Sequence, residues 1–323
     1  MRETELETER VLLGLDPHGP KVVALGGGHG LAAALEAVQC YAGAITGVVS
    51  VADDGGSSGR LIRELGIPPP GDIRRCLLAL TPEPSIVAEL FAYRFASSDV
   101  GGHSLGNLVL AALADLQGDF VDAVATAGEL LGSVGRVVPA APEAGTLSAV
   151  VGDEIVSGQV AIARARGGIR RVWIAPDSVE ATPEALEAVA AADQIVLGPG
   201  SLFTSLVAVL LVPGMAQAVR SAGGDKVLVL NLIDQDGETL GLDGRAHLEA
   251  LERTVGLVGP GAIVAHRGPL AVPEGHRRVE LDPATAAEFG WRLVEADVAD
   301  HGAGWPAHDP LKLGRALQRA FET

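Results

Sequence analysis

Two glycine-rich junctions, each between a short apolar run and a helix-like segment, most constrain how this chain folds. The first reads "KVVALGGGHGLAAALEAVQC" and the second "ADQIVLGPGSLFTSLVAVLLV". A second apolar run, "ITGVVSVADD", follows the first helix-like segment and completes a strand–helix–strand unit. Short apolar strands that alternate with helices are typical of a parallel sheet covered on both faces. The sequence therefore predicts an α/β fold.

The rest of the chain adds elements to this sheet without dividing it. Residues 72–116 have apolar positions at helical spacing, broken by Pro or Gly, and predict a helical cap. "GRVVPA", "TLSAVVGDEIVSGQVAIARA" and "IRRVWIAP" predict an inserted β-rich segment with a hairpin turn at residues 152–154. "KVLVLNL" and "AIVAHR" are further strands, and Asp309 caps a final helix that Pro310 begins. We predict a single domain over residues 21–323 after an N-terminal extension, residues 1–20, with one short helix.

Composition and charge exclude several classes of function. The chain has 48% hydrophobic and 20% charged residues, which is typical of a globular protein. A net charge of −17 disfavours nucleic acid as a partner, because binding to phosphate backbones needs clustered Lys and Arg. Cys40 and Cys76 form no metal-binding motif and favour a reducing compartment. No segment resembles a signal peptide or a membrane span, so we expect a cytoplasmic protein.

The first glycine loop has the composition of a phosphate-binding turn. Glycines let the backbone approach a pyrophosphate, and a helix that starts there offers unpaired N–H groups. The spacing departs from G-x-G-x-x-G because Leu31 occupies the last position, and no Lys-Ser or Lys-Thr pair makes it a P-loop. A tight turn without a ligand is the alternative. The candidate residues in this loop are Gly26, Gly27, Gly28, His29 and Gly30.

The stretch "VADDGGSSGRL" places two carboxylates where the second strand ends. In a dinucleotide fold, an acid at this place accepts a hydrogen bond from a ribose hydroxyl, which is one interpretation of Asp53. Adjacent carboxylates could instead share a divalent ion with phosphate oxygens. The structural alternative is a turn in which Asp54 or Ser57 caps the next helix.

The second glycine loop repeats the strand–glycine–helix pattern. Two such loops at strand carboxyl ends would meet at one crevice, where open α/β sheets usually bind ligands, although two unrelated turns would look the same. The candidate residues here are Gly198, Gly200, Ser201 and Thr204.

Five more polar side chains are candidates at loop-to-helix junctions and at one strand end. Arg74 and its neighbour Arg75 could bind phosphate, and Asn231 ends a strand. His103 and Asn107 could reach a ligand, but the spacing gives His103 no acid or nucleophile partner. Asp72 and Ser104 are expected to be helix N-caps.

Several of these stretches, in this order, closely resemble the gluconeogenesis factor family, the YvcK-like branch of the CofD-like superfamily. The resemblance covers residues 21 to about 317. The stretches that carry it are "VVALGGGHGL", "VSVADDGGSSGRL", "PPGDIRRCL", "GGHSLGNLVLAAL", "ADQIVLGPGSLFTSL", "LLVPGMAQAV" and "NLIDQDGET".

The resemblance implies a Rossmann-like α/β fold and a cytoplasmic role in cell shape and growth on gluconeogenic carbon sources. It also implies a link to cell-wall precursor synthesis, with partners among its regulators, and binding of a UDP-sugar such as UDP-N-acetylglucosamine. CofD enzymes are magnesium-dependent phospholactyl transferases, and their acidic loop matches Asp53 and Asp54. His29 stands where the family commonly has Thr, and the carboxylates of Asp234 and Asp236 would disfavour a nearby phosphate.

Two functions therefore remain in view. In a nucleotide-sugar-binding regulator, the two glycine loops would hold the diphosphate, while Asp53 and Asn231 contact sugar hydroxyls. In a CofD-like transferase, Asp53 and Asp54 would hold Mg²⁺ at the diphosphate being cleaved. NAD binding is a less well supported function because the G-x-G-x-x-G fingerprint is broken. The sequence leaves open whether the chain forms an oligomer.

Overall fold

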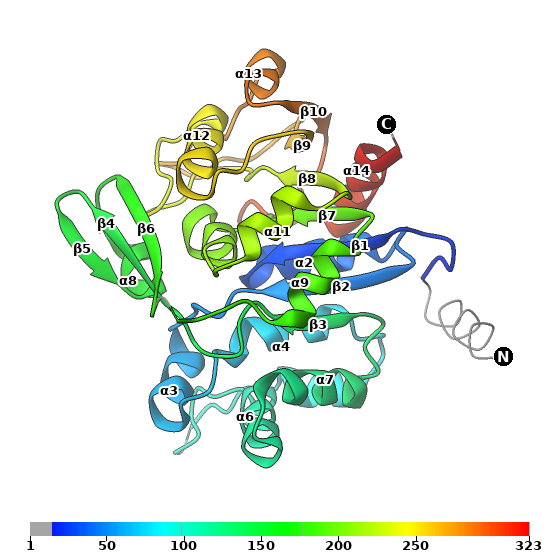
Figure 1. Ribbon diagram of the computed structural model, residues 1–323, viewed down its shortest axis with the longest axis vertical. Coiled ribbons are helices and arrows are strands. Elements are labelled where there is room, and N and C mark those ends of the chain that lie inside the picture. Colours follow the sequence, from blue (N-terminus) through cyan, green and yellow to red (C-terminus); the bar gives the residue numbers. More distant parts are fainter. Residues whose placement is uncertain (1–14, 98, 177, 323) are drawn as a thin grey trace.

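The computed structural model describes residues 15–97, 99–176 and 178–322, so the helix expected in the N-terminal extension lies mostly outside the described residues. Its main feature is a sheet of seven strands in the order β10-β9-β8-β7-β1-β2-β3 (Figure 1). Every neighbouring pair in this sheet is parallel. The strands are β1 (Lys21–Gly26), β2 (Ala44–Val49), β3 (Arg136–Pro139), β7 (Gln194–Leu197), β8 (Asp225–Val229), β9 (Gly261–His266) and β10 (Trp291–Ala296).

Alternate residues of each strand feed two separate hydrophobic cores, as the period of two in a strand requires. In β1, Val23 and Leu25 enter one core while Val22 and Ala24 enter the other. The core around Val22 is covered by α2 (Gly28–Val38), α4 (Pro70–Ala79), α6 (Leu105–Gln117), α7 (Phe120–Leu131) and α14 (Pro310–Glu322). The core around Val23 is covered by α9 (Pro183–Ala190), η1 (Leu202–Val207), α10 (Ala208–Leu210), α11 (Met215–Ser221) and α12 (Gly244–Val255).

Three further helices lie outside these two layers or at their edges. They are α3 (Gly56–Leu65), α5 (Ile86–Ala92) and α13 (Pro283–Glu288). Helices α4 to α6 account for the predicted helical cap, and α4 also packs on β2 and β3. Asp309 caps α14 as predicted, accepting a hydrogen bond from the Lys312 amide at 3.0 Å.

A small antiparallel sheet stands beside the main sheet (Figure 1). Its order is β5-β4-β6, from β4 (Thr146–Val151), β5 (Glu154–Ser157) and β6 (Ile169–Ala175), and the turn predicted near Gly152 joins β4 to β5. Two details of the sequence prediction are wrong. "QVAIAR" forms a helix, α8 (Gln159–Arg164), and "RVVP" joins the main sheet as β3. The sequence prediction also missed β10.

The order of the main sheet reverses between β1 and β7. From β1 the chain builds outward through β2 and β3, whereas β7 starts a second series on the other side of β1. Such a reversal leaves a crevice at the carboxyl ends of the two strands, and ligands of open α/β sheets bind there. The predicted α/β, Rossmann-like fold is confirmed, and it places both glycine loops at this reversal.

The cysteines and the apolar helices test two further expectations. Cys40 and Cys76 are both free, in agreement with the sequence prediction. Among the described residues, no single helix has the length and apolar character needed to cross a membrane. The bent pair Leu202–Leu210 and Met215–Ser221 meets that test by length and composition alone, with 79° between its halves.

Candidate functional site

The two glycine loops touch each other at the reversal of the sheet. A Cβ atom built on Gly30 would lie 2.2 Å from the Pro199 carbonyl oxygen, which is closer than any real contact of this kind. A Cβ built on Gly200 would lie 3.6 Å from the Gly27 carbonyl oxygen. The backbones therefore approach too closely for a side chain at Gly30. The loops form one surface at the carboxyl ends of β1 and β7.

The start of α2 already binds an anion from the protein itself. The Gly28 amide donates to the Asp72 carboxylate at 2.7 Å, and Asp72 also pairs with Arg75. Asp72 is not the N-cap that the sequence predicted, because α4 begins at Pro70 and places Asp72 in its first turn. The helix dipole of α2 favours a carboxylate at this place. A ligand phosphate would therefore meet a helix start that is partly occupied.

Asp53 and Asp54 point to different partners. Asp53 accepts a hydrogen bond from the Gly55 amide at 2.9 Å, and burial, followed by the nearby charge of Asp72, raises its pKa. Asp54 accepts from the Val160 amide at 2.9 Å in the first turn of α8. The predicted cap on the next helix is thus wrong, because α3 begins after Gly55 without a side-chain cap and Asp54 caps a helix of the insertion. The acid beside Asp53 is Asp72.

Three predicted residues form a buried hydrogen-bonded cluster. Asn107 donates from Nδ2 to Ser57 Oγ at 3.0 Å, and Ser57 Oγ lies 2.9 Å from His103 Nδ1. Since Ser57 Oγ accepts from Asn107, its own hydrogen is available to His103. The expectation that His103 has no nucleophile partner is wrong, because the structure places the Ser57 hydroxyl beside it. Asn107 Oδ1 is buried and has no hydrogen-bond partner among the described residues.

The candidates Arg74 and His29 differ in their exposure. Arg74 is buried and donates to the Phe91 carbonyl at 3.3 Å, and burial lowers its pKa to about 10. Its Nε finds no partner within the described residues. His29 is exposed at the start of α2, and partial burial of the ring together with the charge of Arg75 lowers its pKa. Ser104 precedes α6 as predicted but makes no capping hydrogen bond.

A second internal carboxylate binds the start of η1, the helix that follows β7. Glu238 accepts hydrogen bonds from the Phe203 amide at 3.1 Å, from the Thr204 amide at 3.2 Å and from the Thr204 hydroxyl. Burial raises the pKa of Glu238 although these donors favour its charged form. The Thr204 amide and hydroxyl, which the sequence suggested for a ligand, therefore donate to a carboxylate of the protein. "QDGET" was the available signal for Glu238, but the sequence could not show which amides it would reach.

Asn231 joins the second glycine loop in one small cavity. Gly198, Gly200 and Asn231 all line it, together with His247. Asn231 Nδ2 has no hydrogen-bond partner in the described part of the chain. A buried amide donor without a partner is costly, and each such group calls for an explanation such as a ligand or an ordered water. This cavity therefore contains an unmet donor next to the loop backbone.

The carboxylates of Asp234 and Asp236 are engaged away from the glycine loops. Asp234 accepts from the Arg277 amide at 2.8 Å and from the Gly241 amide at 2.7 Å. Burial alone would raise its pKa, but these bonds and His276 lower it. Asp236 lies 3.9 Å from His276 Nε2. Both acids thus have partners of their own.

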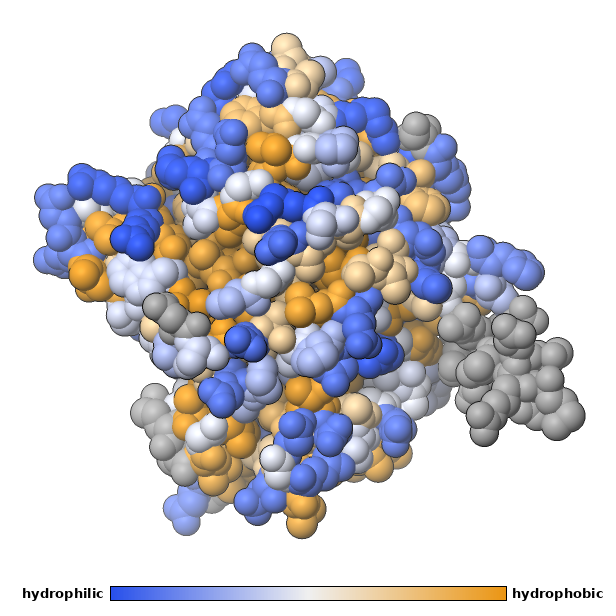
Figure 2. All heavy atoms as spheres, in the orientation of Figure 1, coloured by the Kyte–Doolittle hydropathy of each residue, from blue (hydrophilic) through white to orange (hydrophobic). Residues whose placement is uncertain are grey.

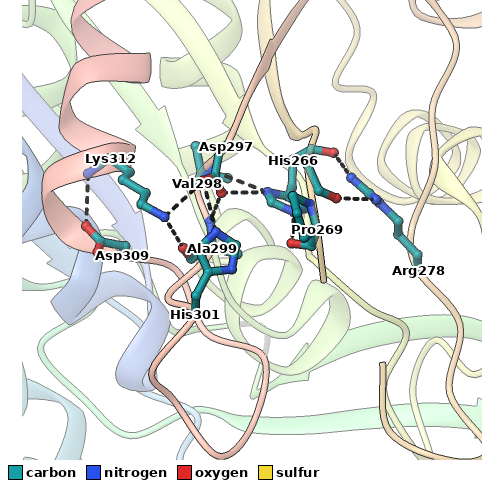
Figure 3. Close-up of polar contacts among 10 residues, drawn as sticks. His266, Pro269, Arg278, Asp297, Val298, Ala299, His301, Asp309 and Lys312 are labelled. Carbon is teal, nitrogen blue, oxygen red and sulfur yellow. Dashed lines mark hydrogen bonds and ion pairs between the residues drawn. The ribbon is translucent and has the colours of Figure 1, made fainter. Parts of the chain in front are cut away.

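A polar cluster that the sequence did not predict lies at the carboxyl ends of β9 and β10 (Figure 3). Asp297 Oδ2 accepts from His301 Nε2 at 2.9 Å and from Lys312 Nζ at 3.0 Å. Hydrogen bonding to His301 and Lys312 lowers the pKa of Asp297 to about 2. His266 Nδ1 accepts from the Val298 amide at 3.2 Å. The cluster fixes the loop after β10 to α14, and its residues share no sequence motif that could have revealed it.

Metal coordination was tested on the described residues. No group of three or more His, Cys, Asp or Glu side chains among them is arranged to hold a metal ion. Mg²⁺ commonly takes one or two carboxylates and keeps several waters, so a pair of acids would suffice. Asp53 and Asp72 are the neighbouring acids at the glycine loops.

The comparison with protein families agrees with this geometry. The sequence model of the family described as 2-phospho-L-lactate transferase CofD matches residues 22–299. The chain belongs to the CofD family. Within it, the chain is 40% identical over 308 residues to the "Gluconeogenesis factor" of Bacillus subtilis, covering 92% of this chain and 97% of that protein. It is 42% identical over 310 residues to the "Putative gluconeogenesis factor" of Mycobacterium tuberculosis H37Rv, covering 92% and 89%.

Solved structures of this CofD-like branch have the same architecture. A crystal structure of a UPF0052 family member from Bacillus halodurans matches with a TM-score of 0.88 and 36% identity, covering 92% of this chain and 98% of that one. A second crystal structure of a Bacillus halodurans protein matches with a TM-score of 0.89. The resemblance seen in the sequence motifs is confirmed by these matches.

Proposed function

We propose that this chain is a cytoplasmic nucleotide-sugar-binding regulator, with UDP-N-acetylglucosamine as the type of ligand. We further propose that it supports growth and cell shape on gluconeogenic carbon sources, through partners in cell-wall synthesis. The shared ancestry with proteins named gluconeogenesis factors supports the link to gluconeogenesis. The proposed class of ligand, a nucleotide sugar, is argued from the residues around the two glycine loops.

The observation that carries the proposal is the unpaired Asn231 amide in the cavity it shares with Gly198 and Gly200. One hydroxyl or carbonyl oxygen of a sugar could accept from this group, because Asn Nδ2 is a donor. The cavity has a volume of about 10 Å³, which is the room of about one water, so the rest of the ligand would lie outside it, along the glycine loops. The Gly28 and Leu31 amides at the start of α2 are taken by Asp72 and by the Gly27 carbonyl. The His29 and Gly30 amides are then the ones left for a diphosphate. Asp53 would accept from sugar hydroxyls.

Titration calorimetry with UDP-N-acetylglucosamine tests the proposal. We expect the parent chain to bind and Asn231→Leu, of similar volume, to weaken binding at least tenfold. Gln217→Leu is the control, because Gln217 is exposed on α11 and does not line the cavity of Asn231. No heat and no thermal shift with the parent chain would refute the proposal, as would an unchanged affinity in Asn231→Leu.

A CofD-like transferase is the second candidate, and the family match together with the Asp53–Asp72 pair favours it. In this scheme the metal-binding acids would be Asp53 and Asp72, because the charge of Asp72 acts on Asp53, whereas Asp54 reaches away to α8. The metal would compete with Arg75 for Asp72. Bound Mg²⁺ would neutralise charge on a diphosphate as its bond breaks. The raised pKa of Asp53 fits an acid that gains a cation, because neighbouring negative charge is relieved.

Incubation with Mg²⁺, a nucleotide diphosphate donor and candidate acceptors tests the transferase. We expect Mg²⁺-dependent product from the parent and its loss in both Asp53→Asn and Asp72→Asn, while Asp54→Asn retains activity. Product formation that survives Asp53→Asn would remove the metal role. Binding of UDP-N-acetylglucosamine without any product would favour the regulator.

A further inference from the structure

A large groove separates the small sheet from α12, on the far side of η1 from the glycine loops. We call it the insertion groove; its volume is about 930 Å³, and its walls are residues 163–169 on one side and residues 236–253 on the other. Buried Phe203 lies in its lining. Figure 2 shows hydrophobic surface in the hollow between the small sheet and the helices, with hydrophilic residues along the rim. This volume is in the range of small-molecule sites.

The walls of the insertion groove are tied to the main sheet at several points. Asp54 binds the Val160 amide of α8, and Gln159 Nε2 donates to the Thr204 carbonyl at 3.1 Å. On the other wall, Glu238 binds the first turn of η1. A Cβ built on Gly237 would lie 2.0 Å from the Ala163 carbonyl oxygen, so the two walls meet at that point. The groove is therefore a formed cavity with a closed end.

Three arginines line this groove without protein partners. Arg164 and Arg166 come from the wall after α8, and Arg253 comes from α12 on the opposite wall. None of the three makes a hydrogen bond or an ion pair with another residue in the described ranges. This is notable in a chain whose net charge is −17, where carboxylates outnumber cations.

Three carboxylates also line the groove, and none of them forms an ion pair with the three arginines in the described part of the chain. Asp236 lies 3.9 Å from His276 Nε2, and Glu238 accepts from the η1 amides. Glu249 acts electrostatically on Arg245 of its own helix. The guanidinium groups are thus left to face solvent from both walls, beside apolar surface that includes Leu240, which is 54% exposed. Guanidinium forks suit carboxylate, sulfonate and phosphate oxygens.

We propose that the insertion groove binds a small amphipathic anion, with its acidic head between the arginines of the two walls and its apolar body against Phe203 and Leu240. This site is separate from the nucleotide-sugar site at the glycine loops. The binding would not require Asn231 or Asp53. Its ligand class follows from the pairing of unpartnered guanidinium groups with apolar lining.

Fluorescence titration of the full chain with 8-anilino-1-naphthalenesulfonate tests the proposal, because this probe combines a sulfonate with an aromatic body. We expect one saturable site, a dissociation constant raised at least tenfold by Arg166→Glu together with Arg253→Glu, and a change below twofold in Arg170→Glu. Arg170 is a fair control because it is exposed on β6 outside the groove and pairs with Asp153 on the surface.

Leu240→Glu provides an independent test that leaves the arginines in place, and its exposure makes it tolerable for folding. We expect it also to weaken probe binding at least tenfold, with circular dichroism unchanged. An unsaturable titration, no binding to the parent, or parental affinity in either groove variant would overturn the proposal. The groove variants should bind UDP-N-acetylglucosamine as the parent does, and loss of both ligands together would overturn the assignment of a separate site.

Discussion

Replacing Gly30 with alanine tests whether the two glycine loops must touch. The new Cβ would lie 2.2 Å from the Pro199 carbonyl oxygen and 2.8 Å from Gly200 Cα. Normal contacts of this kind need about 1 Å more, and the opposing atoms belong to the backbone, so the loops must separate. Overpacking of this sort costs about 1–3 kcal/mol, whereas alanine in a helix returns up to about 1 kcal/mol. We expect Gly30→Ala to lower the free energy of unfolding by about 1 kcal/mol, the middle of the first range less the second term.

Urea denaturation followed by circular dichroism measures this change, and calorimetry measures the ligand affinity of the same variant. Gly128→Ala is the matched control, because Gly128 also lies inside a helix but its added Cβ would meet Leu77 at 3.5 Å, an ordinary contact. We expect this control to be unchanged or stabilised by up to about 1 kcal/mol. If Gly30→Ala matched the control within about 0.5 kcal/mol, the close approach of the two loops would be refuted.

Three further substitutions test other contacts. Asp54→Ala removes the acceptor for the Val160 amide, so we expect a loss of about 1 kcal/mol and faster hydrogen exchange in α8; unchanged exchange would contradict the capping role. In the parent, the buried Gln194 Oε1 lies 2.5 Å from the Tyr41 hydroxyl, and Tyr41→Phe leaves this oxygen without a donor. We expect urea denaturation to show a free energy of unfolding lower by about 1–3 kcal/mol. Parental stability would contradict this role of the hydroxyl. Burial lowers the pKa of His308 to about 4, so the folded state stays neutral while the unfolded state gains a proton. The stability that His308 contributes is present above pH 6.5 and is lost as pH falls toward 4, by up to about 3 kcal/mol. His308→Leu should reduce the dependence of the free energy of unfolding on pH between 6.5 and 4. A pH dependence equal to the parent's would show that it does not come from His308.

The sequence predicted the α/β class because strand and helix periods are local properties. The residues of Lys21–Gly26 alternate between two cores, and the neighbouring strands can be recognised from the same local pattern of apolar residues. "QVAIAR" suggests β-structure because its β-branched residues Val160 and Ile162 are two positions apart, as in a strand. The capping carboxylate that favours the helix comes from Asp54, far away in the chain. β10 was missed because its exposed, charged edge positions interrupt the apolar run.

The candidate site was predicted less completely than the fold. Glycine loops at strand ends are local patterns, so positions such as Gly28 and Gly200 could be named from the sequence. The partners of their helices could not, because Asp72 in the first turn of α4 and Glu238 lie 44 and 34 residues away from Gly28 and Thr204 in the sequence. The Ser57–His103 pair is separated by 46 residues and depends on how α3 and α6 pack. Pairing across such distances is set by the tertiary structure.

The two carboxylates that sit on the starts of α2 and η1 have a consequence for selectivity. Each supplies, from within the chain, the negative charge that a helix start attracts, so a free inorganic anion gains little by arriving there. A ligand must bring affinity from other parts of its structure to compete with a tethered group. The internal acids thus lower the affinity of these two helix starts for abundant simple phosphates. Under the proposed function, a molecule that carries a phosphate together with a sugar or a base would still bind, because it adds contacts that bare phosphate lacks.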